Sequence, residues 1–134
     1  MAELYRFEVF TPYRVFFADM VEVITMTLAD GEIGVMAHHY PCTAPVKCGV
    51  LRIKTQEGEW RSAFVSSGIL QVTEIKTILL VDTAEWPNEI DTERAIAAEK
   101  QARDDLENAM LKFEIDQAKD KLRRAEFRLK VAGT

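Results

Sequence analysis

The sequence is poor in cysteine and has no long apolar run, and both absences exclude classes of protein. Two cysteines in 134 residues, Cys42 and Cys48, are too few for a disulfide framework, so we expect both to stay reduced. No apolar run approaches the ~18 residues that cross a bilayer. The start Met1-Ala2-Glu3 lacks the basic and apolar stretches of a secretory signal. These features predict a cytosolic chain that can still sit on a membrane complex.

Motifs for catalysis and for metal binding are also absent. The chain has no Gly-rich phosphate loop and no Gly-x-Ser-x-Gly elbow. Two histidines and two cysteines lie between residues 38 and 48, but neither a Cys-x2-Cys pair nor a second histidine one helical turn away is present. We therefore predict no metal site and no catalysis by this chain alone. A hydrolase that uses His39 and Cys42 is a distant alternative.

Net charge argues against a nucleic-acid partner. The chain carries a formal charge of −5 at pH 7, and its acidic excess lies in the first 90 residues. Within residues 119–130, by contrast, basic side chains outnumber acidic ones. Such a cationic stretch fits either a solvated helix face or contact with an acidic partner.

The first part of the chain reads as short β-segments separated by turn signals. Tyr5, Phe7 and Val9 alternate with charged neighbours, which predicts a strand with one buried face. In a later segment, Val21 and Val23 are expected to share a face with two threonines. Further strands are expected at residues 15–17, 21–28, 33–36, 48–54, 60–65, 69–72 and 77–81. Repeated short strands of this kind predict an all-β sandwich.

This part contains more large apolar residues than its size requires. They are Phe16, Phe17, Met26, Met36, Tyr40 and Trp60. Each can fill the sandwich core or contribute to a docking surface, and the pattern leaves both interpretations open.

At Pro87 the pattern changes to alanine-rich, highly charged sequence with helical spacing. Asp91 is suited to cap the start of a first helix. One apolar stripe contains Ala95, Ala98, Ala102 and Leu106, and a second contains Ile115, Ala118, Leu122, Ala125 and Leu129. Two such segments joined by a short break predict an antiparallel hairpin. The fold class is therefore an all-β N-terminal sandwich, residues 1–86, followed by a C-terminal antiparallel α-helical hairpin, residues 87–134.

The expected seam between the two helices is weak. Buried apolar surface stabilises by ~25 cal/mol per Å², and alanine buries little of it. A marginal hairpin can exchange packing partners, so the tail is either a switch or a static appendage.

Charged residues on the two helices predict a phosphate-binding site. Asp91 and Arg94 share a face of the first helix, and Arg124 and Arg128 share a face of the second. A folded hairpin can bring these pairs together. Arginine donates to phosphate, while Asp91 or Glu85 can accept from an adenine amino group. Ordinary surface ion pairs are the alternative.

A family resemblance rests on a run near residue 30. Asp30-Gly31-Glu32-Ile33-Gly34-Val35 followed by His39-Tyr40-Pro41 resembles the (E/D)GE(L/I)G(I/V)xxxHxP segment of the epsilon subunit of F-type bacterial ATP synthase. Further matches are Gly49-Val50-Leu51-Arg52-Ile53, Ser67-Gly68-Ile69-Leu70-Gln71-Val72 and Asp82-Thr83-Ala84-Glu85. The likeness covers essentially the whole chain, although Ala37-His38 stands where the family commonly has Pro-Gly.

The resemblance implies a non-catalytic regulatory and coupling subunit of the ATP synthase central stalk, at the cytoplasmic face of the cell membrane and with no required cofactor. Its sandwich would bind the gamma subunit and the c-ring, with Glu32 and His39 as the matching acid and histidine. Its hairpin would fold against the sandwich or extend to the alpha and beta subunits and inhibit ATP hydrolysis. A stand-alone nucleotide-sensing or adaptor module is the alternative.

The resemblance also implies ATP as a regulatory ligand. Some bacterial members bind ATP through an (I/L)DxxRA motif, present here as Ile90-Asp91-Thr92-Glu93-Arg94-Ala95. The implied nucleotide-site residues are Glu85, Ile90, Asp91, Arg94, Ala95, Arg124 and Arg128. Gln101 stands where ATP-binding members have a further arginine, although Lys100 is adjacent.

Overall fold

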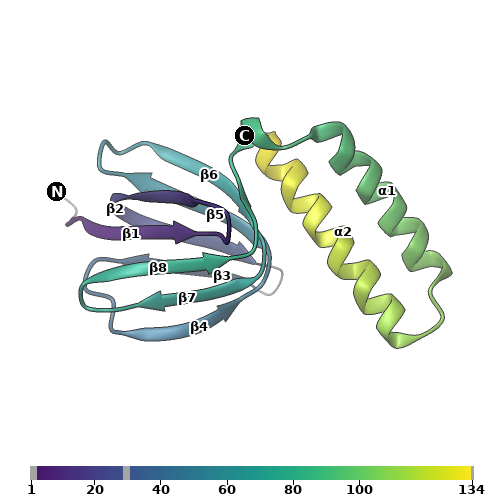
Figure 1. Cartoon of the computed structure of the whole chain (residues 1–134), viewed down its shortest axis with the longest axis horizontal. Helices are drawn as coiled ribbons and strands as arrows, with labels where there is room; N and C mark the ends of the chain where they lie inside the picture. Colours follow the sequence, from purple (N-terminus) through teal and green to yellow (C-terminus); the bar gives the residue numbers. More distant parts are fainter. Residues whose placement is uncertain (1–2, 29–30, 134) are drawn as a thin grey trace.

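The computed structural model describes residues 3–28 and 31–133, and it has two parts, a β-sandwich and a helical hairpin (Figure 1). The strands are β1 (Tyr5–Phe10), β2 (Val15–Leu28), β3 (Gly31–Met36), β4 (Cys42–Val46), β5 (Gly49–Thr55), β6 (Trp60–Val65), β7 (Gly68–Val72), β8 (Lys76–Val81) and β9 (Ala84–Glu85). The 3-10 turn η1 (Pro87–Glu89) leads to helices α1 (Thr92–Asn108) and α2 (Lys112–Ala132). The predicted fold class is confirmed. Asp30, the first residue of the family motif, lies outside the described residues.

The strands form one continuous hydrogen-bonded sheet that curls into two facing layers. Its order is β4-β7-β8-β1-β2-β5-β6-β9, and β3 also pairs with β2. β1 runs parallel to β8, whereas the other paired strands are antiparallel. Gly68 begins β7 where β8 passes close by, because a Cβ atom there would overlap the Leu80 carbonyl oxygen.

Strand β2 differs from the sequence prediction in its length and in the residues that face the core. The sequence predicted separate segments at 15–17 and 21–28, but the structure has one strand that pairs first with β1 and then with β3 and β5. A register shift between Val21 and Val23 marks a β-bulge. A bulge inserts one residue and so reverses which side chains face inward. Val21 is buried, but beyond it Ile24 and Met26 point into the core and Val23 does not, so the predicted shared face is wrong.

The core fills the space between the two layers. Phe7 and Val9 of β1 are fully buried, which confirms the alternation read from the sequence. The sequence did not decide whether six large apolar residues belong to the core or to the surface. Phe16, Phe17 and Met26 are buried, whereas Met36, Tyr40 and Trp60 are 62%, 74% and 44% exposed. The first three therefore form core, and the last three are surface.

The hairpin lies beyond one end of the sandwich, and α2 is the helix that faces it (Figure 1). α2 packs on β5 and β6, while α1 packs along the far side of α2. The C-terminus lies beside the junction of the two parts, and the N-terminus lies at the opposite end of the sandwich. No helix in the described part of the chain combines the length and apolar character needed to cross a membrane.

Candidate functional site

α1 starts at the residues that the sequence singled out. The Asp91 carboxylate caps the helix, since its Oδ1 accepts from the Arg94 backbone N–H at 3.1 Å. Asp91 itself is extended, with φ −79° and ψ 97°, so the chain turns into the helix only at Thr92. The cap fixes Arg94 one turn into α1, on the side that faces α2.

Small side chains hold the two helices close together. Ala95 and Ala102 of α1 and Ala118 and Ala125 of α2 are buried between them, as the predicted stripes require. Ala98 is an exception, because it is exposed and lines an open groove along the helix pair. A longer side chain at 98 would fill this space, so alanine keeps the groove open.

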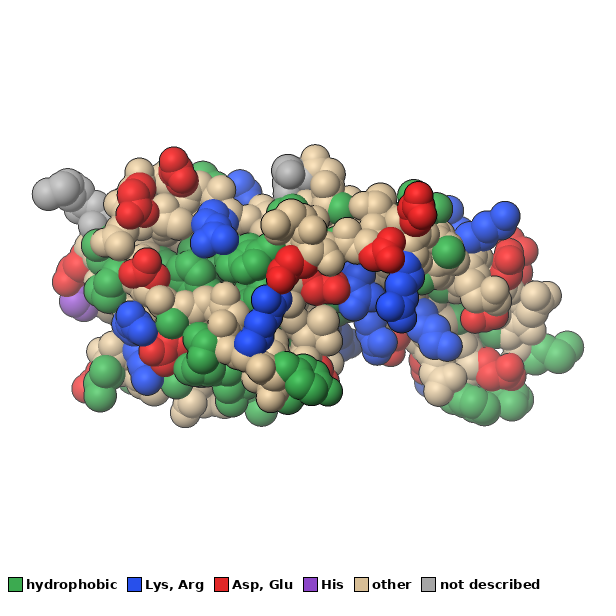
Figure 2. All heavy atoms as spheres, turned by 45° about the horizontal axis from the view of Figure 1, so that its top comes forward, with side chains coloured by type: hydrophobic (Ala, Val, Ile, Leu, Met, Phe, Trp, Pro, Cys, Tyr) green, Lys and Arg blue, Asp and Glu red, His purple; other side chains and the backbone are tan. Residues whose placement is uncertain are grey.

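The groove forms a cavity of about 500 Å³ at the base of the hairpin. Of the predicted nucleotide-site residues, six line it: Glu85, Asp91, Arg94, Ala95, Arg124 and Arg128. Ile90 does not, because its side chain is buried with Val50, Phe64 and Val131 under α2. Figure 2 shows Lys and Arg side chains gathered where the hairpin meets the sandwich, bordered by Asp and Glu.

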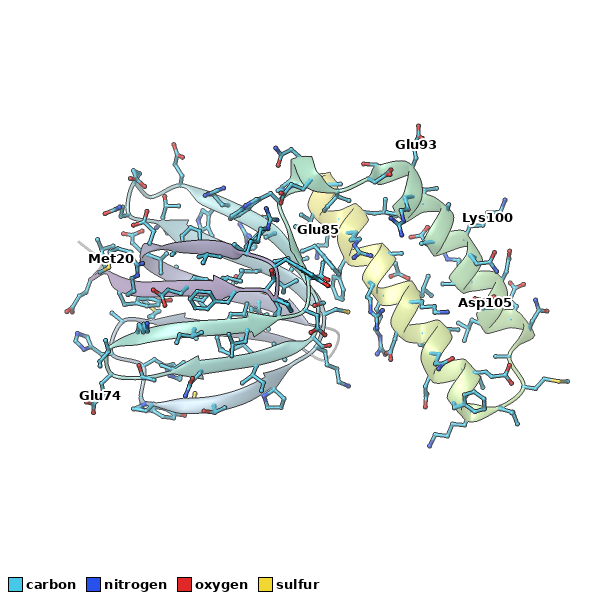
Figure 3. All side chains as sticks on the ribbon, in the orientation of Figure 1. Met20, Glu74, Glu85, Glu93, Lys100 and Asp105 are labelled. Carbon is cyan, nitrogen blue, oxygen red and sulfur yellow. The ribbon has the colours of Figure 1, made fainter. Side chains whose placement is uncertain are left out.

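Arg128 joins the hairpin to the sandwich. Its Nε donates to the Glu85 carboxylate at 2.7 Å, and its guanidinium lies 4.5 Å from the centre of the Phe64 ring. Both partners belong to the sandwich, so this single side chain fixes the end of α2 by an ion pair and by a cation–π contact. Glu85 lies at the boundary between the two parts in Figure 3.

Sequence reasoning missed several residues of the cavity. Lys121, Glu89 and Asp105 also line it. Lys121 could have been found, because it lies three and seven residues before Arg124 and Arg128 and so shares their helix face. Gln101 lines the cavity and donates to Asp105 Oδ1 at 2.9 Å. Lys100 does not line it and points away from α2 (Figure 3).

The segment before the hairpin is clamped to the sandwich. Arg14 donates to both oxygens of the Glu89 carboxylate at 2.9 Å and 2.8 Å, and the Trp86 backbone N–H donates to the same group at 2.9 Å. The Arg14 hydrogen bond is the main cause of a Glu89 pKa below its usual value. Trp86 stacks on Phe16 at 4.3 Å between ring centres, and the Arg61 guanidinium covers the Trp86 ring at 3.8 Å. η1 is therefore fixed to the sandwich.

The two residues matched to the c-ring and gamma contact lie apart. Glu32 is exposed near the start of β3, opposite Thr27, whereas His39 follows the other end of that strand. The His39 ring stacks on Tyr40 at 4.8 Å between centroids, and its Nδ1 lies 2.8 Å from the Tyr40 carbonyl oxygen. Between them in the chain, His38 adopts a φ of 65°, the left-handed conformation that glycine adopts more readily.

The cysteines behave as structural thiols. Both are free, and Cys42 packs partly against the sandwich core. Cys48 lies at the edge of the interface with α2, where burial raises its pKa. No hydrogen bond joins His39 to Cys42 in the ranges 3–28 and 31–133, so the geometry gives no support to a Cys-His nucleophile.

A β-sandwich joined to a two-helix hairpin, with a charged cavity between the helices, defines a class of two-part protein. Known proteins identify the family. The beta-sandwich domain of the ATP synthase Delta/Epsilon chain matches residues 4–87, and the long alpha-helix domain of the same chain matches residues 88–133. The chain therefore belongs to the ATP synthase delta/epsilon family, whose epsilon chain is a non-catalytic subunit of the F1 complex.

Curated relatives agree with this assignment. The chain is 45% identical over 132 residues to the ATP synthase epsilon chain of Caldicellulosiruptor bescii, covering 98% of this chain and 95% of that one. It is 41% identical over 134 residues to that of Caldanaerobacter subterraneus subsp. tengcongensis, covering 99% and 96%. These matches confirm the resemblance read from the sequence and leave no support for a stand-alone adaptor.

A solved structure shares the fold. The chain matches a subunit in the Euglena gracilis mitochondrial ATP synthase structure of OSCP, F1 and c-ring, with a TM-score of 0.82 over 98% of this chain and 82% of that chain. The sequences are 21% identical, so this likeness establishes the common fold alone.

Proposed function

We propose that this chain is the regulatory and coupling subunit of the ATP synthase central stalk, and that its hairpin switches between a docked and an extended state. In the extended state it contacts the alpha and beta subunits and inhibits ATP hydrolysis. In the docked state it binds ATP, which stabilises docking. The observation that carries the proposal is the cavity whose walls come from both helices and from Glu85 of the sandwich. Such a site is complete only while the hairpin is docked.

The small docking interface supports a movable arm. Its buried apolar part consists of Val50 and Phe64 from the sandwich, Ile90 from the linker and Val131 from α2, with Cys48, Phe127 and Ala132 partly buried against them. Arg128 adds one ion pair and one ring contact. Burial of so few side chains stabilises docking only modestly, so a ligand that bridges the two parts can shift the equilibrium. The seam between α1 and α2 is similarly poor in large residues.

Two regions of the sandwich are suited to partner binding. An apolar groove of about 670 Å³ lies on the outer face of β7 and β8, lined by Phe10, Pro45, Ile69 and Leu80, and we assign it to the gamma subunit. The end of the sandwich remote from the hairpin, near Met20 and Glu74 in Figure 3, carries His39. We assign Glu32 and His39, which lie near opposite ends of β3, to the contacts with the c-ring and the gamma subunit, as the family resemblance implies. These contacts would hold the chain peripherally at the cytoplasmic face of the membrane.

The cationic stretch of α2 supports contact with an acidic surface once the arm is extended. Lys119, Arg123 and Lys130 are exposed, and undocking frees Arg128 from Glu85. The exposed apolar tip of the hairpin adds Met110, 90% exposed, and Phe113, 60% exposed. An arm with an apolar tip and a basic face is suited to reach the alpha and beta subunits.

Calorimetric titration of ATP into the isolated chain and into Arg94→Ala tests the nucleotide site. We expect saturable binding by the wild-type chain and a loss of about 10- to 100-fold in affinity in the variant, because a charge-assisted hydrogen bond contributes roughly 1.5–3 kcal/mol. Lys100→Ala is the matched control, since Lys100 is on the same helix but points away from the cavity. Equal heats in wild type and Arg94→Ala would remove the proposed site.

A further inference from the structure

A second hollow, distinct from the cavity between the helices, lies where α2 passes two loops of the sandwich. It has a volume of about 170 Å³, and we call it the joint hollow; its lining residues are Lys47, Cys48, Ser67, Asp120, Arg123 and Arg124. The β4–β5 and β6–β7 connections supply the first three of these residues. The two loops are neighbours because the end of β4 pairs with the start of β7, and the start of β5 with the end of β6. The walls therefore come from both parts of the molecule.

The joint hollow carries an excess of positive charge. Asp120, Arg123 and Arg124 share a face of α2, at spacings of three and four residues. Lys47 and Arg124 take part in none of the ion pairs found among residues 3–28 and 31–133. Arg123 and Asp120 pair at 3.8 Å, but both side chains are largely exposed, so this pair is weak. One carboxylate thus faces three cations, and an anion between the cations would reduce their mutual repulsion.

The field of these charges reaches the Cys48 thiol. Burial raises the pKa of Cys48, and the guanidinium groups of Arg124 and Arg123 act in the opposite direction. The Asp120 carboxylate adds to the effect of burial, and the more distant Arg128 opposes it. Cys48 itself is half-buried against the apolar cluster of the docking interface. An anion held beside this cluster is less screened by water than one on an open surface.

The donors and the volume indicate which anion fits. Arginine presents planar donors that match two oxygens of a tetrahedral oxyanion, and lysine adds a point charge on a flexible stem. The joint hollow is much smaller than the cavity of about 500 Å³ between the helices, so it suits a single phosphate ion rather than a nucleotide. Inorganic phosphate keeps at least one proton at neutral pH, and an ionised carboxylate such as Asp120 can accept a hydrogen bond from that hydroxyl.

We propose that the joint hollow binds inorganic phosphate. Lys47 and the two arginines donate to its oxygens, and Asp120 accepts from its hydroxyl. Because Lys47 belongs to the sandwich and the arginines belong to α2, the bound ion joins the two parts of the molecule. The site is separate from the proposed nucleotide site and does not depend on it, although Arg124 lines both.

Amide chemical shifts of the full chain, recorded while sodium phosphate is added, test the site. We expect saturable shifts at Cys48, Ser67 and Arg123, with half-saturation on the order of 1 mM, because exposed donors bind an anion weakly. Sodium chloride at equal ionic strength should not produce them. Sulfate has no hydroxyl for Asp120 at neutral pH and should bind more weakly than phosphate, and Asp120→Asn should narrow this difference.

Variants locate the ion. Lys47→Ala and Arg123→Ala should each weaken phosphate binding about tenfold, as for loss of one charge-assisted contact. Both side chains are exposed, and neither lines the cavity between the helices. Lys119→Ala is the matched control, because Lys119 is exposed on α2 and does not line the joint hollow. Arg94→Ala, which alters the larger cavity, should bind phosphate as the wild type does.

Alkylation of Cys48 provides a second measurement. In a Cys42→Ser background Cys48 is the remaining cysteine, and bound phosphate should slow its reaction with iodoacetamide relative to sodium chloride at equal ionic strength. Lys47→Ala should lose this protection.

The outcomes distinguish this site from the proposed nucleotide site. Shifts that do not saturate, or that sodium chloride reproduces, would overturn the phosphate site. Phosphate binding that Arg94→Ala abolishes and Lys47→Ala leaves unchanged would also overturn it, because the ion would then lie in the cavity between the helices. Neither result bears on the titration of ATP, which tests the nucleotide site by itself.

Discussion

Two arginines hold the C-terminal part of the chain to the sandwich. Arg128 holds α2, and Arg14 holds the linker η1. Arg128 reaches from α2 to Glu85 and Phe64, so the proposed undocking of the arm would break its contacts. Arg14 reaches from the sandwich to Glu89, and it also donates to the Ala84 carbonyl at 3.2 Å. The Arg14–Glu89 pair therefore fixes the linker rather than the arm.

The Arg14–Glu89 pair makes the linker sensitive to acid. Because the folded-state pKa of Glu89 lies below its ordinary value of 4.5, the pair stabilises fully above about pH 4.5 and loses this contribution as pH falls through the folded-state value. We expect Trp86 fluorescence to change below about pH 4.5 in a Trp60→Phe background, in which Trp86 is the remaining tryptophan.

Glu89→Gln is the control for this transition, because its amide does not titrate. The variant should show no acid-dependent change in Trp86 fluorescence while far-ultraviolet circular dichroism still reports a folded sandwich. The same acid-dependent profile in both proteins would show that another group is responsible.

Two elements determine where the arm begins and what it can hold. η1 is clamped through Trp86 and Glu89, whereas Ile90 and Asp91 are extended and precede α1. The pivot of the proposed movement therefore lies at Ile90 and Asp91, a few residues beyond the change of sequence pattern at Pro87. The groove beyond the pivot exists because the helix pair carries alanine along its cavity face.

Filling the groove should weaken nucleotide binding without unfolding the hairpin. Ala98→Leu places a larger side chain in the cavity, and leucine is nearly as good a helix former as alanine. We expect at least about a tenfold loss of ATP affinity by calorimetry, with helical circular dichroism unchanged.

Ala97→Leu controls for the added leucine, since Ala97 is exposed and lies outside the cavity. It should bind ATP as the wild-type chain does. If Ala98→Leu also bound ATP normally, the ligand would have to lie elsewhere.

The sequence predicted where strands and helices lie more reliably than it predicted which segments join into one strand. β6 has the bounds that were predicted, and Asp91 caps α1 as expected. β4 was missed because it contains Pro45, which weakens a strand pattern but is tolerated where a strand pairs on one side only, here with β7. The bulge in β2 was missed because it depends on pairing with two partners, which no local pattern records.

The cavity was predictable in its charges and not in its shape. Helical spacing placed Arg124 and Arg128 on one face, and it would also have placed Lys121 there. The commitment of Arg128 to Glu85 and the burial of Ile90 depend on how α2 docks on the sandwich, a long-range arrangement. Ala98 was expected in the helix seam, and only the packing of α1 on α2 shows that it lines the groove.

At the scale of the whole molecule, the sandwich and the hairpin differ in how firmly they are held. The sandwich has a continuous core of large residues, and its surface carries an apolar groove and a hollow at the end remote from the hairpin. The hairpin is held by a small apolar cluster and by Arg128, and its cavity spans the joint. A rigid body with a weakly held arm can couple occupancy of the cavity to the position of the arm.

Inhibition by the arm is the central claim, and ATP hydrolysis by the assembled F1 complex tests it most directly. Complexes are prepared with the full chain or with a chain that lacks residues from Asp91 onward, after co-purification shows that both chains are incorporated. We predict faster hydrolysis with the shortened chain at low ATP concentration, where the cavity is empty and the arm is extended, and a smaller difference as ATP fills the cavity. Equal rates at every ATP concentration would contradict the account.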